Sequence, residues 1–317
     1  MDLSILFCGT AGSVPTARRG LPGVLLRRGA DRILFDCGEG TQRQLVRSGG
    51  LPDLDAIFFT HFHADHWLGL PGMLKSFALR ERDKPLTIYG QPGTRDVLER
   101  VRFIFGRPPY PLTITELEPG EPVRRDDYVI EPFNVRHRVR AYGYAIVEDE
   151  RPGRLDADRA IELGVSDGPD LGRLTRGEVV NGVKPEDVIG PPRAGRKIVL
   201  SGDTAPCDML QIAAHRTDVL VHEATFVEEE RERAAETGHS TARQAAETAA
   251  EADVGLLALV HLSGRYGGRE VLDEALATFP RTVLPRDFDS IEVPFAEKGA
   301  PELVRFERPA SAPAAGA

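Results

Sequence analysis

At 317 residues the chain is long enough for one large domain or two small ones, and its 41% hydrophobic and 28% charged residues are ordinary for a globular protein. No apolar run approaches the roughly 20 residues that cross a bilayer, which excludes a membrane-spanning protein. The net charge of −9 disfavours a nucleic-acid partner at first sight, but ions bound at carboxylates are absent from that sum, so charge alone excludes nothing.

The N-terminus and the cysteines bear on the compartment. The segment Met1-Asp2-Leu3-Ser4 lacks the basic region of a signal peptide and leads directly into a strand-like run. Three cysteines, Cys8, Cys37 and Cys207, form an odd set without CxxC spacing, which argues against a disulfide framework. We therefore expect a cytoplasmic protein with no membrane partner.

The first half of the sequence predicts mainly short strands. Apolar runs between Gly and Pro turns predict strands at 3–7, 24–26, 32–35 and 56–59. Helices are predicted at 71–79 and, after the start signals Gly93 and Thr94, at 94–105.

Residues 151–196 interrupt this pattern with Gly, Pro and charge. A stretch of this length without regular periodicity is usually functional or mobile, so we expect an excursion from the main domain. Strand–helix alternation then resumes, with a helix predicted at 241–252. The sequence thus predicts one domain over 1–308 with 151–196 inserted, and an Ala/Pro/Ser-rich disordered tail at 309–317. Two strand-rich halves with helices outside suit a four-layer αββα sandwich.

Five apolar, strand-like runs end at residues that can bind metal or carry negative charge. Runs at 54–59, 128–136, 197–200, 218–221 and 254–260 lead to, in turn, His61-x-His63-x-Asp65-His66, His137, Asp203, His222-Glu223 and His261. Because open sheets bind ligands beyond the carboxyl ends of their strands, these residues could meet in one cleft. A single histidine is usually a surface or core residue, but three of the eight histidines fall within six residues beside an aspartate, which indicates metal binding.

The motif can serve two adjacent metals, because residues two apart lie on one side of an extended segment while the next residues turn into a helix. Imidazole and carboxylate ligands suit Zn²⁺, with Mn²⁺ or another divalent ion as the alternative. We assign His61, His63 and His137 to one metal and Asp65, His66 and His261 to the other, with Asp203 bridging. Two close metals suit phosphoester hydrolysis, since they generate hydroxide near neutral pH and hold the attacking and leaving oxygens.

Phosphoester hydrolysis also benefits from a proton donor for the leaving oxygen. His239 in Gly238-His239-Ser240-Thr241 is the candidate, and Glu223 could orient it and stabilise its charge. The competing interpretations are a helix-capping segment for His239 and a surface carboxylate for Glu223. Ser263 and Arg265, which follow His261, could hold a phosphate beside the second metal.

Several longer motifs carry a more specific resemblance. They are Phe35-Asp36-Cys37-Gly38-Glu39-Gly40-Thr41-Gln42-Arg43-Gln44, residues 60–66 followed by Gly69-Leu70-Pro71-Gly72, Ser201-Gly202-Asp203-Thr204, His222-Glu223-Ala224-Thr225-Phe226, Gly238-His239-Ser240-Thr241 and residues 261–266. The His-x-His-x-Asp-His motif alone is typical of the metallo-β-lactamase fold. Together, and in this order, the motifs resemble tRNase Z (ribonuclease Z), the endonuclease that matures tRNA 3′ ends, across 3–293.

The resemblance implies the seven metal ligands above, two zinc ions per subunit, and Glu223 with His239 as a proton relay. It also implies that the excursion is an arm that grips the tRNA elbow, with Gly168-Pro169 as its turn, and that the enzyme is a homodimer acting on precursor tRNA. The chain departs from the family in having Arg18-Arg19-Gly20 where an Arg-Asn pair is common, and in an arm with nearly balanced charge.

The expected reaction is removal of the 3′ trailer from precursor tRNA. Asp65 helps to orient the attacking water and His239 protonates the departing oxygen, leaving a 3′-hydroxyl on the tRNA and a 5′-phosphate on the trailer. The alternatives are a metal-dependent hydrolase of small phosphodiesters or sulfate esters on the same fold, and a tRNA-binding protein that has lost catalysis. The arm favours the first, because a small substrate would not need it.

Overall fold

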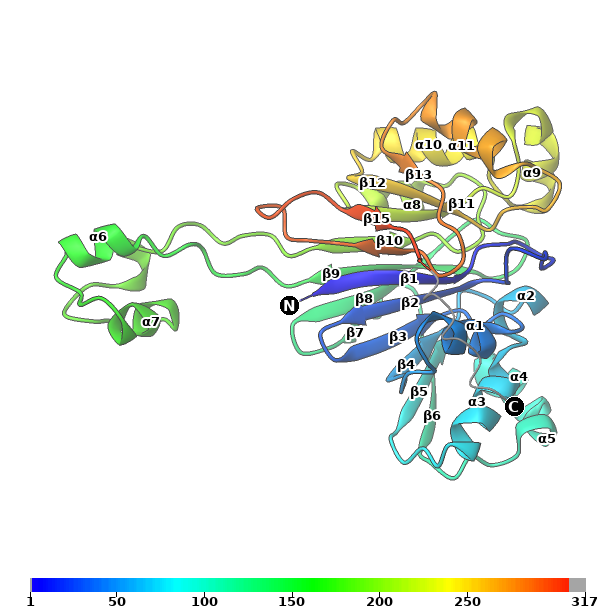
Figure 1. The fold of residues 1–317 in the computed structure, drawn as a ribbon, viewed down its shortest axis with the longest axis horizontal. Coiled ribbons are helices and arrows are strands. Elements are labelled where there is room, and N and C mark those ends of the chain that lie inside the picture. The colour runs from blue at the N-terminus through cyan, green and yellow to red at the C-terminus, as the bar shows by residue number, and fades with distance from the viewer. Residues whose placement is uncertain (1, 308–317) are drawn as a thin grey trace, which may run out of the picture.

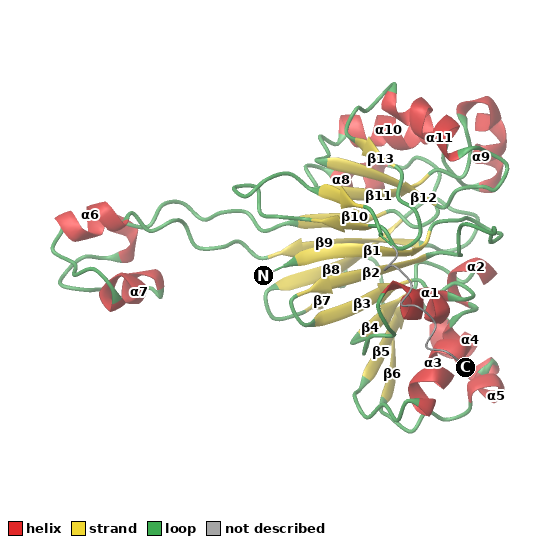
Figure 2. Cartoon of the chain, in the orientation of Figure 1, coloured by secondary structure: helices red, strands yellow, loops and turns green. Residues whose placement is uncertain are grey.

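A computed structural model describes residues 2–307 and shows two β-sheets packed face to face, with helices covering both outer faces (Figure 1). Colouring by secondary structure makes the layers visible, with the sheets in the middle and helices outside (Figure 2). The predicted four-layer αββα sandwich is confirmed. The tail predicted at 309–317 lies outside the described residues.

The first sheet has eight strands. In spatial order they are β15 (Glu302–Val304), β14 (Ser290–Glu292), β1 (Leu3–Gly9), β2 (Gly23–Arg28), β3 (Asp31–Phe35), β4 (Ala56–Phe58), β5 (Leu86–Gly90) and β6 (Leu112–Glu116). The helices of this half are α1 (Thr41–Ser48), α2 (Ala64–Trp67), α3 (Leu70–Leu79), α4 (Thr94–Arg100) and α5 (Arg102–Phe105). The run from β3 to β6 is parallel.

The second sheet has seven strands. Their spatial order is β13 (Thr282–Val283), β12 (Leu256–Val260), β11 (Val219–Glu223), β10 (Lys197–Leu200), β9 (Tyr142–Glu148), β8 (Tyr128–Asn134) and β7 (Val123–Arg124). The helices of this half are α8 (Asp208–Ala214), α9 (Arg231–Thr237), α10 (Ala242–Glu251) and α11 (Gly268–Leu276), and Glu228–Glu230 form a 3₁₀ turn.

The central strands are apolar on both faces because the middle of each sheet is buried on both sides. In β1, Ile5 and Phe7 enter the core between the sheets, while Leu6 enters the core beneath the helices. Aromatic rings cross the inter-sheet layer: Phe58 lies 5.4 Å from Tyr144 between ring centroids. The Tyr144 hydroxyl donates to the Phe59 carbonyl at 2.7 Å, so this core fixes the strand that leads into the histidine motif.

Two helix predictions show that local sequence signals mark where a helix begins better than how far it continues. The helix predicted at 241–252 is α10, and its N-cap Thr241 forms a capping box with Gln244. The helix predicted at 94–105 is wrong as a single element: Val101, at φ −99° and ψ 5°, separates α4 from α5. The break allows Phe105 to be buried in the core beneath the helices. This tertiary contact leaves no signal in the hydrophobic periodicity of the sequence.

An arm connects β9 to β10 and extends away from the sandwich (Figure 1, green). Its two stalk segments pair at Arg151–Arg193 and Leu155–Ile189. Its head holds α6 (Ala157–Glu162), α7 (Pro169–Thr175) and a 3₁₀ turn at Pro185–Asp187. Six buried residues form a separate small core there, namely Ala160, Val165, Leu174, Val180, Val183 and Val188. Residues 151–196 are therefore more ordered than their composition indicates.

Within residues 2–307, no helix is long and apolar enough to cross a membrane.

Candidate metal centre and active site

The site lies where strands of both sheets end. In the second sheet β10, β11 and β12 are parallel, and β9 is antiparallel to both β8 and β10, so β8 runs in the same direction as β10. Their carboxyl ends lead to His137, Asp203, Glu223 and His261, while β4 of the first sheet leads to the histidine motif. Because the strands end at one edge of the sandwich, five distant segments meet there.

The motif turns from strand to helix at His63, whose extended backbone caps α2. This turn is fixed by Asp36, which accepts hydrogen bonds from the Thr60 backbone N–H and hydroxyl, each at 2.8 Å. The Asp36 carboxylate also contacts His66 Nδ1 at 2.8 Å. Such a contact orients a histidine so that its other nitrogen can bind metal. Asp36 lies in one of the family motifs but was not among the predicted site residues; the available signal was its position directly after β3.

Two groups of side chains have the spacing of metal sites. The ligand atoms of the first lie within 4.8 Å of one another and belong to His61, His63, His137 and Asp203. The second group, with the same spacing, consists of Asp65, His66 and His261. His63 Nδ1 and His137 Nε2 are 3.2 Å apart, and the Nε2 atoms of His66 and His261 are 3.3 Å apart. The structure thus brings all seven predicted ligands together in the predicted two sets.

Asp203 lies between the groups. One of its carboxylate oxygens is 3.3 Å from Nε2 of both His66 and His261 and 3.7 Å from Nε2 of His61. The side chain is buried. A carboxylate in this position can contact an ion in either group, as a bridging ligand must.

The chemistry of these donors fits divalent cations. His61 is fully buried, and its Nε2 has no hydrogen-bond partner among the described residues. Burial, together with the neighbouring His66, holds the pKa of His61 well below its usual range, so its nitrogen remains a free electron-pair donor. Burial opposes protonation of His66 as well, but Asp203 and Asp36 outweigh it and raise the pKa of His66 well above its usual value. The site therefore attracts positive charge, which a proton or a metal ion can supply.

His239 stands beside both groups and is paired with Glu223. Its Nδ1 lies 2.8 Å from a carboxylate oxygen of Glu223, which is buried. Burial disfavours the charged ring, but the Glu223 carboxylate outweighs this effect and raises the pKa of His239 to about 9. Glu223 is held by the backbone N–H groups of Thr204 and Thr225 at 2.9 and 3.1 Å. Glu223 is thus an internal carboxylate, not a surface one, and it keeps His239 charged at neutral pH.

Two further features of this region were absent from the sequence analysis. The Thr225 hydroxyl lies 2.8 Å from His261 Nδ1 and also contacts Glu223, so it connects the second group to the His239–Glu223 pair. In addition, Asp203, His239 and His261 have ligand atoms within 4.8 Å of one another, so His239 also has the spacing of a metal ligand.

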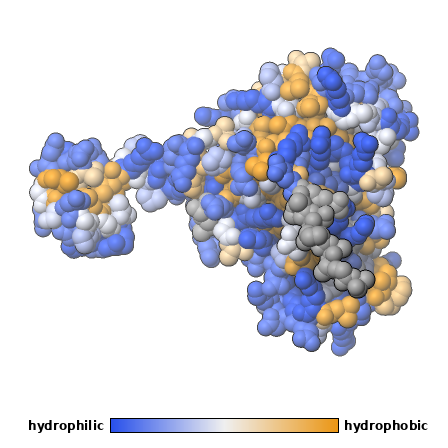
Figure 3. All heavy atoms as spheres, in the orientation of Figure 1, coloured by the Kyte–Doolittle hydropathy of each residue, from blue (hydrophilic) through white to orange (hydrophobic). Residues whose placement is uncertain are grey.

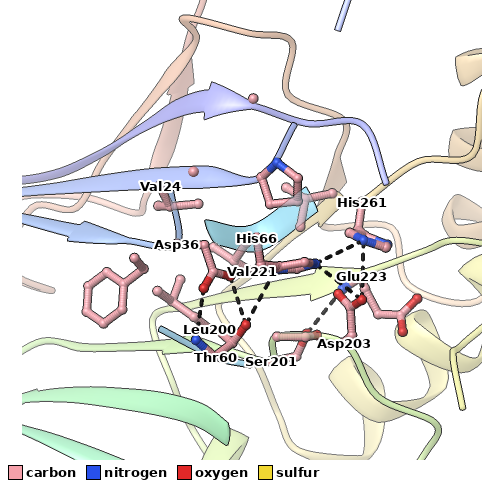
Figure 4. Close-up of a pocket in the computed structure, with 16 residues that line it drawn as sticks. Val24, Asp36, Thr60, His66, Leu200, Ser201, Asp203, Val221, Glu223 and His261 are labelled. Carbon is pink, nitrogen blue, oxygen red and sulfur yellow. Dashed lines mark hydrogen bonds and ion pairs between the residues drawn. The ribbon is translucent and has the colours of Figure 1, made fainter. Parts of the chain in front are cut away.

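A small cavity lies behind the second group, between the sheets. Its volume is about 50 Å³, and Asp36, His66, Asp203 and His261 contribute to its lining. Figure 4 shows Asp36 joined to Thr60 and His66, with His261 and Glu223 close to Asp203 on the other side. Contacts on the inner side of the site, such as that of Asp36 with His66, therefore hold the metal-binding side chains in position.

The predicted substrate-binding residues lie outside the two groups. Arg265 pairs with Glu230 at 3.0 Å, and its guanidinium lies over the rings of Phe226 and Tyr266. Its Nε is 3.3 Å from the Ser263 hydroxyl. Gly168 and Pro169 lie in the arm head, where Gly168, at φ 101°, precedes α7. The predicted turn thus starts a helix.

The fold and the paired donor groups define a class of metal-dependent enzymes. The family described as "Beta-lactamase superfamily domain" matches residues 31–153 and 181–262, passing over most of the arm. Similar curated proteins named Ribonuclease Z include those of Myxococcus xanthus, 48% identical over 83% of this chain and 88% of that protein, and Gemmatimonas aurantiaca, 46% identical over 94% and 98%. The crystal structure of the short form of human tRNase Z superposes with a TM-score of 0.68 at 27% identity, covering 92% of this chain and 99% of that one. The chain belongs to the ribonuclease Z family, as its motifs predicted.

Proposed function

We propose that this protein is a zinc-dependent endoribonuclease that removes the 3′ trailer from precursor tRNA, leaving a 3′-hydroxyl on the tRNA and a 5′-phosphate on the trailer. The observation that carries the proposal is the charged His239–Glu223 pair beside two groups of metal-binding side chains, in a chain of the ribonuclease Z family. A precursor tRNA substrate supports a cytoplasmic location for the enzyme.

The metal ligands are those assigned from the sequence, with two ions per subunit. His61, His63 and His137 would hold one ion, and Asp65, His66 and His261 would hold the other, with Asp203 able to contact both; the spacing of the two groups supports this assignment. When bound, the ions supply hydroxide near neutral pH and offset charge on the phosphate. Asp65 is oriented by the Ser13 backbone N–H at 2.8 Å, so its carboxylate can help to position the attacking water.

His239 has the second chemical task. Glu223 holds the imidazole at Nδ1, which leaves Nε2 to donate a proton to the departing 3′ oxygen. A donor of this kind contributes typically about 10²–10⁴-fold in rate. Because its pKa is about 9, His239 carries the required proton throughout the neutral range.

The arm binds the tRNA away from the cleavage site. Its head exposes Ile161, Leu163 and Val179, and an apolar patch is visible there in Figure 3. Arg159 and Arg173 pair with carboxylates of the head. Apolar contact with exposed bases suits such a surface better than extensive phosphate binding. The Gly168–Pro169 turn lies within this head.

The enzyme acts as a homodimer. The surface of the first helical layer exposes Val46 on α1, Leu79 on α3 and Phe103 and Ile104 on α5, with Leu79 78% and Phe103 85% exposed. Figure 3 shows apolar spheres over the α5 region. Large apolar side chains on neighbouring helices are typical of a self-association surface. Leu79→Glu should shift sedimentation toward the monomer, and a wild-type monomer at assay concentrations would refute the assignment.

Cleavage of a 3′-extended precursor tRNA tests the activity. We expect one discrete, metal-dependent cut that a chelator abolishes and His239→Ala slows by about 10²-fold or more. His215→Ala is the matched control, because His215 is an exposed histidine outside the site. Intact tRNA beside rapid hydrolysis of a small phosphodiester would refute the proposal.

A further inference from the structure

A basic groove opens next to the second metal group. Its volume is about 820 Å³, and it lies between the loop before β2, the segment after His261, the start of α11 and the segment after β13. Neither the metal ligands nor the His239–Glu223 pair line it. The proposed chemical step therefore leaves this groove unexplained.

The groove is continuous with the site. Its lining begins at Leu262 and Ser263, immediately after the metal-binding His261. The opposite wall is tied to this segment by hydrogen bonds from the Gly12 N–H to the Leu262 carbonyl and from the Leu262 N–H to the Thr10 carbonyl, each at 3.0 Å. A strand leaving the cleft on this side would enter the groove directly.

Positive charge on the groove is partly unpaired. Arg18 and Arg286 are exposed, and neither guanidinium has an ion pair or side-chain hydrogen bond among residues 2–307. Arg269 is 93% exposed and pairs with Asp273 at 3.4 Å. Arg305 pairs with Asp289. Four exposed arginines thus face one groove, and at least two are free to bind an anion.

Nearby carboxylates cancel only part of this charge, because Asp273 and Asp289 pair with Arg269 and Arg305 but not with Arg18 or Arg286. Asp287 is buried behind the groove, where it accepts hydrogen bonds from Thr10, Gln44 and the Gly20 backbone N–H. The lining also includes apolar side chains, namely Tyr266, Leu272 and Leu284. A positively charged groove with apolar and aromatic surface is the combination that binds single-stranded nucleic acid.

We propose that this groove binds the first nucleotides of the 3′ trailer, with Arg18 and Arg286 contacting its phosphates and the apolar lining contacting its bases. The assignment rests on the proposed endonuclease activity. It makes trailer length a determinant of efficiency, because a longer trailer offers the groove more phosphates and bases than a trailer of a single nucleotide does.

The test compares two precursor tRNAs that differ only in their trailers, one of a single nucleotide and one of about eight, within the range that a single-strand site covers. For the Arg18→Gln/Arg286→Gln double variant, we expect the ratio of kcat/KM for the long trailer to that for the short one to fall about tenfold, as expected for the loss of one or two charged contacts. Arg243→Gln removes an exposed arginine outside the groove and should keep the wild-type ratio. An unchanged ratio in the double variant would overturn the proposal.

A binding measurement separates this proposal from the activity on which it rests. Fluorescence anisotropy of a 5′-phosphorylated, single-stranded RNA of trailer length should give a salt slope reduced by about 1.4 in the double variant, at about 0.7 per lost phosphate contact. If the wild type cleaves neither precursor but shows this difference, the endonuclease proposal fails and the groove remains an RNA site. If the oligonucleotide binds both proteins equally, the groove assignment fails even where cleavage is observed.

Discussion

Glu148, the last residue of β9, should be one of the most sensitive positions outside the active site. Its buried carboxylate accepts hydrogen bonds from Arg196 Nε at 2.8 Å and Nη2 at 2.7 Å and from Arg28 Nε at 2.7 Å. Glu148 ends the strand before the arm, and Arg196 is the last residue of the arm. The cluster therefore joins both ends of the arm to each other and to β2.

We predict that Glu148→Gln destabilises the protein by about 3 kcal/mol. Removing one partner of a buried ion pair typically costs about 3–5 kcal/mol, because the remaining charge is left uncompensated. The lower value applies here because Arg28 keeps Asp127, at 2.6 Å, and Arg196 keeps the Val293 carbonyl, at 2.8 Å. At about 2 °C per kcal/mol for a chain of this size, Tm should fall by about 6 °C.

The effect should depend on pH with a defined sign. Burial raises the pKa of Glu148, but hydrogen bonds from Arg196 and Arg28 outweigh burial and lower it from 4.5 to about 2. A lowered folded-state pKa gives stability that is present above 4.5 and is lost as pH falls toward 2. The Tm difference between wild type and Glu148→Gln should thus be constant from pH 8 to about 5 and narrow below 4.5.

Calorimetry across this pH range tests the reasoning, with Glu150→Gln as the control because Glu150 is exposed two residues further along the chain. The control should unfold within about 1 °C of wild type, as surface substitutions usually do. A Glu148→Gln protein that matched the control at pH 7 would refute the view that this cluster contributes to stability.

Three further substitutions test the site and the arm. Glu223→Gln should lower the pKa of His239 from about 9 toward its ordinary value, so the basic limb of the kcat/KM profile should move to lower pH; an unmoved limb would argue against His239 as the acid. Asp203→Asn should reduce the divalent metal retained by purified protein, measured by mass spectrometry, while Asp208→Asn on exposed surface should not; equal metal content would argue against the shared ligand. Glu297→Gln removes the carboxylate that binds two arginines of the arm stalk, and should raise KM for precursor tRNA several-fold while leaving small-phosphodiester turnover at the wild-type rate; an equal loss on both substrates would indicate a general defect.

The sequence predicted the layers of the fold better than the order of the strands. Strands such as β1 and β12 are apolar on both faces, so a continuous run marks them. By contrast, β13 and β7 have two residues each, too few for any pattern. The pairing of β1 with β14, nearly the whole chain apart, depends on tertiary packing. Sequence order contains no signal for it.

The candidate site residues were predictable where they directly follow a strand. His61, His137, Asp203 and His261 follow strand ends, and His63, Asp65 and His66 lie in the turn and short helix directly after β4. A pattern of apolar runs and the residues that follow them therefore brought the seven predicted ligands to one place. Residues that act through other residues had no comparable signal: Asp36 orients His66 from a left-handed turn, at φ 57°, and Thr225 links two parts of the site. The expected role of Arg265 as a phosphate ligand stays a prediction, because its guanidinium pairs with Glu230.

The arm shows why composition alone underestimates order. Its apolar residues are few and irregularly spaced, yet six of them close a core of their own. That core is separate from those of the sandwich, so the direction of the arm depends on its root. There Glu297 binds both Arg151 and Arg193, and the ring of Phe295 lies under Arg151 at 3.5 Å. Changes at this root should alter where a long substrate is presented without altering the chemical step, which is why they should appear in KM for tRNA and not in the turnover of a small ester.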